Sequence, residues 1–134
     1  MVEEVEIFVE ADINLTETEE KVCLAISNVL GGATFRVSSA QRGSRLVAYA
    51  KGQNSLIKLR NLLRNDCIRD AARKFFFKKT RAETLTFYLN KQVAYAGHIS
   101  FSEEIDESPL GPLHFIIKTS NPQQLIEWLT EKSS

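Results

Sequence analysis

The side chains with the clearest chemical potential in this chain are cations, and they are concentrated in its middle. Residues 21–81 hold fourteen Lys and Arg side chains against two acids, a local charge of +12. Residues 1–20 carry a charge of −8 and residues 82–134 a charge of −4, so the whole chain is neutral. Rows of Lys and Arg neutralise phosphates and release counterions, the dominant source of non-specific nucleic-acid affinity. The alternative, which stays open here, is that the acidic and basic parts pair with each other inside one molecule.

The expected phosphate contacts lie on a loop over 40–44 and on the outer face of a helical segment over 54–79. Arg suits this role because its planar guanidinium matches the geometry of phosphate oxygens. The candidates are Arg42, Arg45, Arg69, Arg73, Lys74, Lys78, Lys79, Arg81 and Lys91. Tyr88 is the one aromatic side chain that the pattern offers for stacking on a base, because residues 75–77 are expected in the core.

The spacing of Cys, His and acidic residues predicts neither catalysis nor metal binding. Cys23 and Cys67 fall in expected helices, and His98 and His114 fall on expected strands. No spacing between them is typical of a nucleophile with its base or of a zinc site. The acidic segment 103–107 lacks the glycine turn and ligand spacing of a calcium-binding loop. We therefore expect no enzyme, no metal and no cofactor; a pocket that gathered both histidines and a cysteine would favour a hydrolase instead.

Hydrophobic periodicity predicts the elements that hold these side chains. Alternation at two-residue spacing predicts a strand over 4–13, whose acidic face meets solvent or a basic partner. A capping box that begins at Thr16 predicts a helix over 16–30, which ends at a Gly-Gly pair. Strands over 33–39 and 45–51 are expected to form a hairpin with their apolar side chains on one face. The pairs in that register are Val37 with Val47 and Phe35 with Tyr49.

The second half of the chain predicts helices, a second hairpin, a further strand and a last helix. Residues 54–79 are helical, in one piece or two. The segment 84–101 is expected to be a hairpin, in which a three-residue loop over 90–92 joins two strands. A strand over 112–118 follows. Asn121 is expected to cap the last helix, with Pro122 at its first position.

Taken together, the pattern predicts a single α+β domain over residues 1–134. Its elements follow the order β-α-β-β-α-α-β-β-β-α, a mostly antiparallel sheet with helices packed on one face. No apolar run is long enough to span a bilayer, and the acidic N-terminus is unlike a secretory signal. With two cysteines, the chain is expected in the cytoplasm.

Several short motifs in the chain resemble a family of small archaeal proteins that are labelled predicted RNA-binding or exosome-associated. The segments that carry this resemblance are residues 60–64, 68–74, 87–94, Gly97, 100–101 and 108–112. The resemblance implies an α+β fold similar to the ribosomal protein that holds 5S rRNA, a role in RNA processing or translation, and a tendency to form homodimers. The chain departs from the family at Arg69, where an aliphatic residue is more usual.

Two functions remain open from the sequence. The first is a non-catalytic RNA-binding module that acts through the basic helix and the hairpin loop. The second is a homodimeric protein–protein interaction module without nucleic acid, in which the acidic strand of one subunit faces the basic helix of another. Its apolar patch would come from Phe77 or from the face that Tyr88, Ala94 and Ala96 share.

Overall fold

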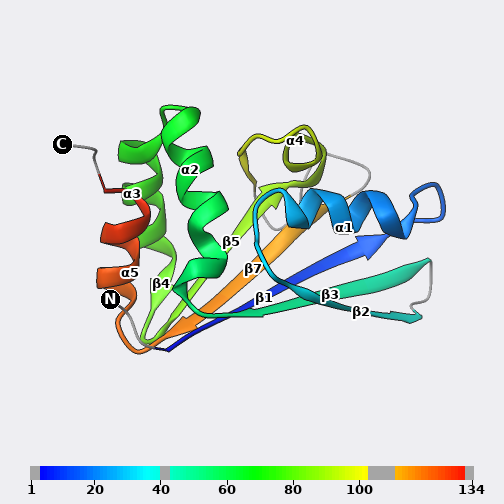
Figure 1. The fold of residues 1–134 in the computed structure, drawn as a ribbon, viewed down its shortest axis with the longest axis horizontal. Helices are drawn as coiled ribbons and strands as arrows, with labels where there is room; N and C mark the ends of the chain where they lie inside the picture. The colour runs from blue at the N-terminus through cyan, green and yellow to red at the C-terminus, as the bar shows by residue number, and fades with distance from the viewer. Residues whose placement is uncertain (1–3, 40–42, 103–110, 132–134) are drawn as a thin grey trace.

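The computed structural model describes residues 4–39, 43–102 and 111–131. Within these ranges, seven strands form one antiparallel sheet in the order β2-β3-β1-β7-β5-β4, and β6 pairs with β5 off this path. The helices all lie on one side of the sheet (Figure 1). The strands are β1 Val5–Ile13, β2 Thr34–Ser39, β3 Ser44–Lys51, β4 Thr80–Arg81, β5 Thr84–Asn90, β6 Phe101–Ser102 and β7 Pro112–Thr119. The helices are α1 Glu19–Ser27, a 3-10 turn Gln53–Leu56, α2 Ile57–Asn65, α3 Arg69–Lys79, α4 Lys91–Tyr95 and α5 Pro122–Leu129.

The core lies between the sheet and the helices, and strand alternation builds it. In β1, every second side chain from Val5 to Ile13 is buried and the others face away from the helices. Phe87 and Phe115, on paired strands, stack with 5.1 Å between their ring centroids, and Phe76 of α3 packs against Phe87. The predicted α+β class, with an antiparallel sheet and helices, is therefore confirmed.

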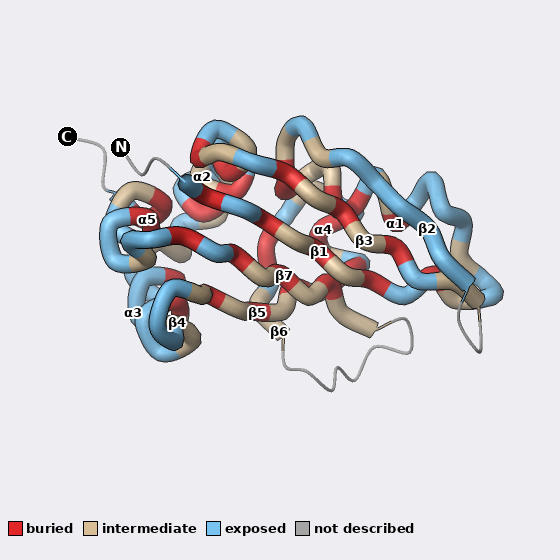
Figure 2. Tube along the Cα trace, turned by 90° about the horizontal axis from the view of Figure 1, so that it is seen from below, coloured by how far each residue is buried: buried red, intermediate tan, exposed pale blue. Residues whose placement is uncertain are grey.

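None of the described helices lies over the opposite face of the sheet (Figure 1 and Figure 2). Seen from below, the strands lie in front of the helices, and buried positions alternate along them with partly and fully exposed ones (Figure 2). Antiparallel sheets often keep one face on the core and the other in solvent. We call this uncovered side the open face of the sheet.

The helical predictions are confirmed in kind but not at every boundary. Residues 54–79 form two helices, and the break falls at Cys67, which has a left-handed backbone with φ of 58°. Helix α1 is shorter than the predicted 16–30, and its cap is Thr18, whose side chain accepts a hydrogen bond from the Lys21 amide. Thr16 does not cap the helix, because Glu17 is held outside it by hydrogen bonds from Asn14.

The predicted register of the first hairpin is wrong by one residue. Val37 pairs with Leu46 and Phe35 with Ala48, so both lie on the helix side of the sheet. A shift of one residue turns every side chain of a strand to the other face. The prediction favoured bulky residues for the core, whereas the core takes Ala48 and its neighbours of the same face and leaves Tyr49 on the open face.

The predicted hairpin over 84–101 is also wrong in its second arm. The chain enters α4 directly after β5, because the Asn90 side chain accepts a hydrogen bond from the Val93 amide and caps the helix. The main partner of β5 is β7, and β6 supplies the return strand only at Phe101–Ser102. The predicted element order therefore lacks both α4 and the short strand β4. At the last helix the prediction is confirmed, with Asn121 as cap and Pro122 at the first position.

Candidate nucleic-acid interface

Five predicted cations lie close together on α3 and on the short strand that continues it. We call this set the α3–β4 cation surface, and its members are Arg73, Lys74, Lys78, Lys79 and Arg81. All except Lys79, which is partly covered, are exposed. Helical spacing places Lys74 and Lys78 on the outer face of α3, opposite the buried Ala72 and Phe76, whereas Arg73 lies on the flank that faces α5.

Members of this surface differ in how they are held. Arg73 lies 3.7 Å from a carboxylate oxygen of Glu127 on α5 and over the ring of Phe77. The Lys79 ammonium lies over the Phe75 ring. In contrast, Lys74, Lys78 and Arg81 form no ion pair with any described residue. These three side chains are exposed, and no described carboxylate lies within ion-pair distance of them.

Other predicted cations lie apart from that surface. Arg45 is on the open face, 3.6 Å from a carboxylate oxygen of Asp12. Arg69 donates a hydrogen bond to the backbone carbonyl of Glu131 at 3.1 Å. Arg42 lies outside the described residues. The alternative that acids and bases pair within the molecule is thus correct for part of the chain, as in the contact of Arg60 with Glu131.

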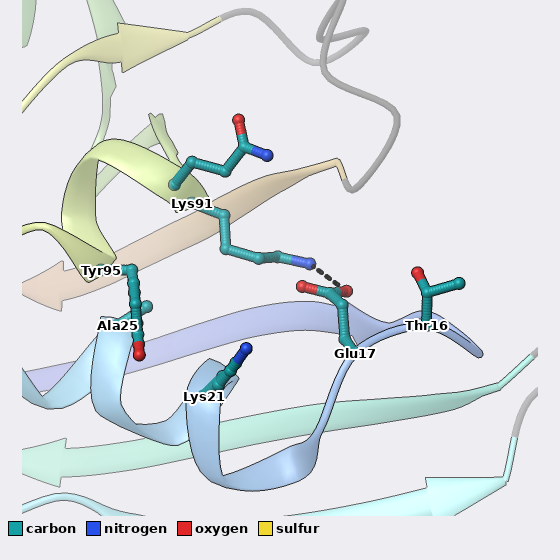
Figure 3. Close-up of a pocket in the computed structure, with 7 residues that line it drawn as sticks. Thr16, Glu17, Lys21, Ala25, Lys91 and Tyr95 are labelled. Carbon is teal, nitrogen blue, oxygen red and sulfur yellow. Dashed lines mark hydrogen bonds and ion pairs between the residues drawn. The ribbon is translucent and has the colours of Figure 1, made fainter.

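Lys91 is the predicted site residue that the structure places differently from the rest. Its side chain is only 4% exposed, and its ammonium lies 3.0 Å from Glu17 Oε1 and 2.7 Å from the Asp12 carbonyl oxygen. Figure 3 shows this ion pair in a pocket that Lys21 and Tyr95 also line. Lys91 therefore links α4 to the loop before α1 by an ion pair and does not belong to an exposed cationic surface.

Four aromatic rings gather on the open face, and sequence reasoning found only one of them. Phe8 of β1 lies beside Tyr49 of β3, with 5.1 Å between ring centroids. Tyr88 of β5 stacks on His114 of β7, with 4.4 Å between centroids and 18° between planes. All four side chains are partly exposed. We call them the open-face rings.

Hydrogen bonding and burial fix the state of one of these rings. The Tyr49 hydroxyl donates to Glu6 Oε2 at 3.1 Å. Burial raises the pKa of the Tyr49 phenol, and the hydrogen bond to Glu6 and the Glu6 charge raise it further. The phenol therefore stays protonated at neutral pH and serves as a donor.

A row of cations crosses one end of the same face. The register places Lys51 and Lys118 on either side of Glu6, and Thr84 between Lys118 and Arg81. The Lys118 ammonium also lies over the Phe8 ring, 5.5 Å from its centroid. Because Arg81 belongs to both sets, the α3–β4 cation surface continues onto the open face and reaches the open-face rings.

A shallow polar pocket lies at the other end of the rings. Its walls include Tyr88 and His114, and Arg45 and Asp12 stand beside them. His114 Nδ1 is 3.6 Å from Glu10 Oε2. The pocket therefore combines a flat aromatic wall with both acidic and basic groups.

In the described part of the chain, none of the pockets gathers both histidines and a cysteine. His98 lies 3.1 Å from Asp66, whereas His114 lies beside Glu10 in a pocket that contains no cysteine. Burial raises the pKa of the Cys23 thiol, and the Glu19 charge adds to this, which disfavours the thiolate form. Within the described ranges, no three His, Cys, Asp or Glu side chains are grouped to hold a metal ion. The acidic segment 103–107 lies outside the described residues.

In the part of the chain that the structure describes, no helix is long and apolar enough to cross a bilayer.

Comparisons with known proteins agree with one another. Residues 6–119 match the model of a family described as RNA binding. A UPF0201 protein of Pyrobaculum calidifontis is 41% identical over 123 residues, which cover 91% of this chain and 86% of the relative. A UPF0201 protein of Sulfurisphaera tokodaii is 39% identical over 128 residues, which cover 96% of this chain and 88% of the relative.

A solved structure extends this likeness to the fold. The 2.2 Å crystal structure of a UPF0201 protein from Methanococcus jannaschii matches with a TM-score of 0.82 and 28% sequence identity, over 93% of this chain and 98% of that one. The resemblance to small archaeal proteins with an RNA-binding label is therefore confirmed, while exosome association and likeness to the 5S-rRNA-binding protein stay predictions. The chain belongs to the archaeal UPF0201 family, and its residues 6–119 match the family model described as RNA binding.

Proposed function

We propose that the protein is a non-catalytic RNA-binding module whose α3–β4 cation surface contacts the phosphate backbone. The observation that carries this proposal is the exposure of Lys74, Lys78 and Arg81 without an ion pair among the described residues. Each such cation that neutralises a phosphate releases condensed counterions. The description of the family as RNA binding supports RNA as the polyanion.

The members of the surface have different expected roles. Lys74 and Lys78 are point charges on flexible stems, so they follow the backbone without fixing its geometry. Arg73 is held by Glu127 and by the Phe77 ring, so its guanidinium is positioned before RNA arrives. Arg81 joins α3 to the open face. Contacts of this kind set affinity and register but read no base, so binding by this surface is independent of sequence.

Charge reversal tests the proposal. The double variant Lys74→Glu/Lys78→Glu removes two phosphate contacts, and we expect the log–log salt slope of single-stranded RNA binding to become shallower by about 1.4. The matched control is Lys21→Glu/Lys58→Glu, which makes the same change in net charge on α1 and α2, outside the α3–β4 cation surface. Fluorescence anisotropy against several RNA sequences measures both slopes.

Two results would overturn this proposal. One is that the wild-type protein shows no salt-sensitive RNA binding at micromolar concentration. The other is that both double variants lose affinity equally, since this would show a response to net charge alone. A loss confined to Lys74→Glu/Lys78→Glu, and equal for all RNA sequences, supports it.

A homodimeric interaction module is the second candidate function, and the open face favours it. Phe8, Val47, Tyr49 and Ile116 present partly exposed apolar surface there, next to the acids of β1 and the bases of β3. A two-fold contact between two such faces would place acids of one subunit against bases of the other. Light scattering at micromolar concentration tests it; a monomer would contradict it.

The apolar patch predicted for that dimer is only partly present. Phe77 is 39% exposed on α3, as the prediction requires. Tyr88 and Ala94 do not share a face, because Ala94 lies in α4 and is buried under the helix layer, whereas Tyr88 is on the open face. Ala96 follows α4 and is exposed.

A further inference from the structure

We propose that the open face of the sheet binds the unpaired bases of single-stranded RNA, which stack on the open-face rings. This inference rests on the proposed function, because it takes the α3–β4 cation surface as the path of the phosphate backbone. It goes beyond that function by naming the class of RNA and the groups that the bases touch.

The rings have the arrangement that base stacking requires. Phe8 and Tyr49 lie side by side on β1 and β3, and Tyr88 and His114 form a stacked pair on β5 and β7. Their face of the sheet is the one that none of the described helices covers (Figure 2). Sheets that present aromatic side chains from neighbouring strands are a common platform for single-stranded RNA, because every base offers a flat π-face.

The spacing of the two ring pairs suits successive bases. The register puts Phe8 and Tyr49 in one row across the sheet, while His114 and Tyr88 lie in the row of Glu10. Consecutive positions on one face of a strand are about 7 Å apart. Two successive unstacked bases of one RNA strand can therefore each contact one of the two ring pairs.

Charge on the open face is arranged to complement such a ligand. The cation row of Lys51, Lys118 and Arg81 crosses one end of the rings and continues into α3. An RNA backbone bound along this row would place its bases over Phe8 and the other open-face rings. Of the acids on this face, Glu6 lies within the cation row, between Lys51 and Lys118, and Glu10 lies nearer the centre. Both repel phosphates but accept hydrogen bonds from the amino groups of bases.

The polar pocket beside the rings provides a place for one base. The stacked Tyr88 and His114 rings form a wall of it, and Arg45 lies at its edge together with Asp12. Arginine is a donor suited to the oxygen and nitrogen acceptors on base edges. This pocket is the part of the face where a preference among bases would arise.

These features favour single strands over duplex RNA. In an A-form helix the bases are paired and stacked on one another, so flat rings on a sheet cannot reach their faces. A duplex would also press its phosphates against Glu6 and Glu10. The cations of α3 alone would still attract a duplex, but with no contribution from the rings.

The experiment replaces the rings one at a time and keeps a ring in each control. The ring-deleting variants are Tyr49→Ala and Tyr88→Ala; the controls are Tyr49→Phe and Tyr88→Phe. The probes are a single-stranded oligonucleotide that contains 2-aminopurine, whose fluorescence falls on stacking, and a duplex of equal length. Thermal melts followed by circular dichroism verify that each variant is folded.

We expect each alanine variant to lose roughly 5- to 150-fold in single-strand affinity, since stacking is worth ~1–3 kcal/mol per base. Both phenylalanine variants stay within about twofold, the fluorescence quench is lost only in the alanine variants, and the salt slope is unchanged because no phosphate contact is removed. Duplex affinity is the same in all five proteins.

Three results would overturn the inference. If folded alanine variants bind single strands as well as wild type while Lys74→Glu/Lys78→Glu does not, the α3–β4 cation surface binds RNA but the open-face rings do not. If wild type binds the duplex more tightly than the single strand, base stacking on the rings is also refuted. If the alanine variants turn a dimer into a monomer without changing RNA affinity, a second copy of the chain covers this face instead.

Discussion

Replacing Lys91 by Met decides whether this lysine supports the fold or binds RNA. The change keeps most of the aliphatic volume and removes the ammonium, which lies 3.0 Å from Glu17 Oε1 and 2.7 Å from the Asp12 carbonyl oxygen. Glu17, whose side chain is 9% exposed, would then be a buried anion that has lost its cation. We expect Lys91→Met to destabilise the protein and to leave RNA affinity within about twofold.

The structure sets the expected size of this loss. Breaking a buried ion pair by removing one partner costs about 3–5 kcal/mol. Glu17 keeps two hydrogen bonds from Asn14, at 3.0 and 2.8 Å, so the lower end of that range applies. For a chain of 134 residues, an unfolding entropy of about 2.1 cal/mol/K per residue converts about 3 kcal/mol into a fall in Tm of about 11 °C.

A double-mutant cycle measured by thermal melts separates the charge effect from packing. Lys91→Met/Glu17→Gln removes both charges and should lose less than the sum of the two single variants, by about 1–3 kcal/mol. The control is Lys21→Met, on an exposed lysine that lines the same pocket, with an expected change within about 0.5 kcal/mol. A Tm shift of Lys91→Met below about 3 °C, joined to a tenfold loss of RNA affinity, would refute this account of Lys91.

Two further predictions concern the loops around the sheet. The Asp66 carboxylate accepts from the Ile99 amide at 3.0 Å, which lowers its pKa, and His98 lowers it further against the opposing effect of burial. This stabilisation is present above the pKa of Asp66 in the unfolded chain and is lost as pH falls through the pKa in the folded protein. Asp66→Ala should therefore lower the free energy of unfolding by about 1–3 kcal/mol at pH 7 and by progressively less in acid, as measured by urea unfolding. Gly43→Ala should cost about 1–3 kcal/mol or more in the same assay, because φ is +77° and a Cβ would overlap the Ile13 carbonyl oxygen; an unchanged midpoint for either variant contradicts its reasoning.

Elements with a strong local signal were predictable from the sequence. Strand β1 alternates without interruption, so its buried face follows from period two alone. Helix α5 begins with an Asn cap and a Pro at its first position, and both play the expected roles. The order β2, β3, β1, β7, β5 across the sheet did not follow, because antiparallel pairing of distant strands leaves no trace in local periodicity.

The errors have two physical causes. At Asn90 the same residues suit a hairpin loop and a helix cap, and only the packing of the following α4 against α1 and β5 decides between them. In β3 both faces are apolar enough for a core, and the pairing of Ala48 with Val9 selects the smaller one. The larger side chains, among them Tyr49, are thereby left on the open face.

That second cause also explains why the ring platform could not be predicted. Each of β1, β3, β5 and β7 contributes one ring, and the four come from positions that span residues 8–114. On the open face of its own strand, each ring is the single aromatic side chain. Only the sheet order makes them neighbours, so a search of the sequence for a run of exposed aromatics finds Tyr88 alone.

The position of the charges also explains how a chain with zero net charge can attract a polyanion. On the open face, Asp12 pairs with Arg45 and Glu6 accepts a hydrogen bond from Tyr49, while Glu127 and Glu131 pair with Arg73 and Arg60. Among the described residues, Lys74, Lys78 and Arg81 have no such partner, so α3, β4 and the adjoining end of the sheet keep an excess of positive charge. Since exposed charges farther apart than about 8 Å are largely screened at physiological salt, a polyanion at this end responds to the local excess of cations and not to the zero net charge of the chain.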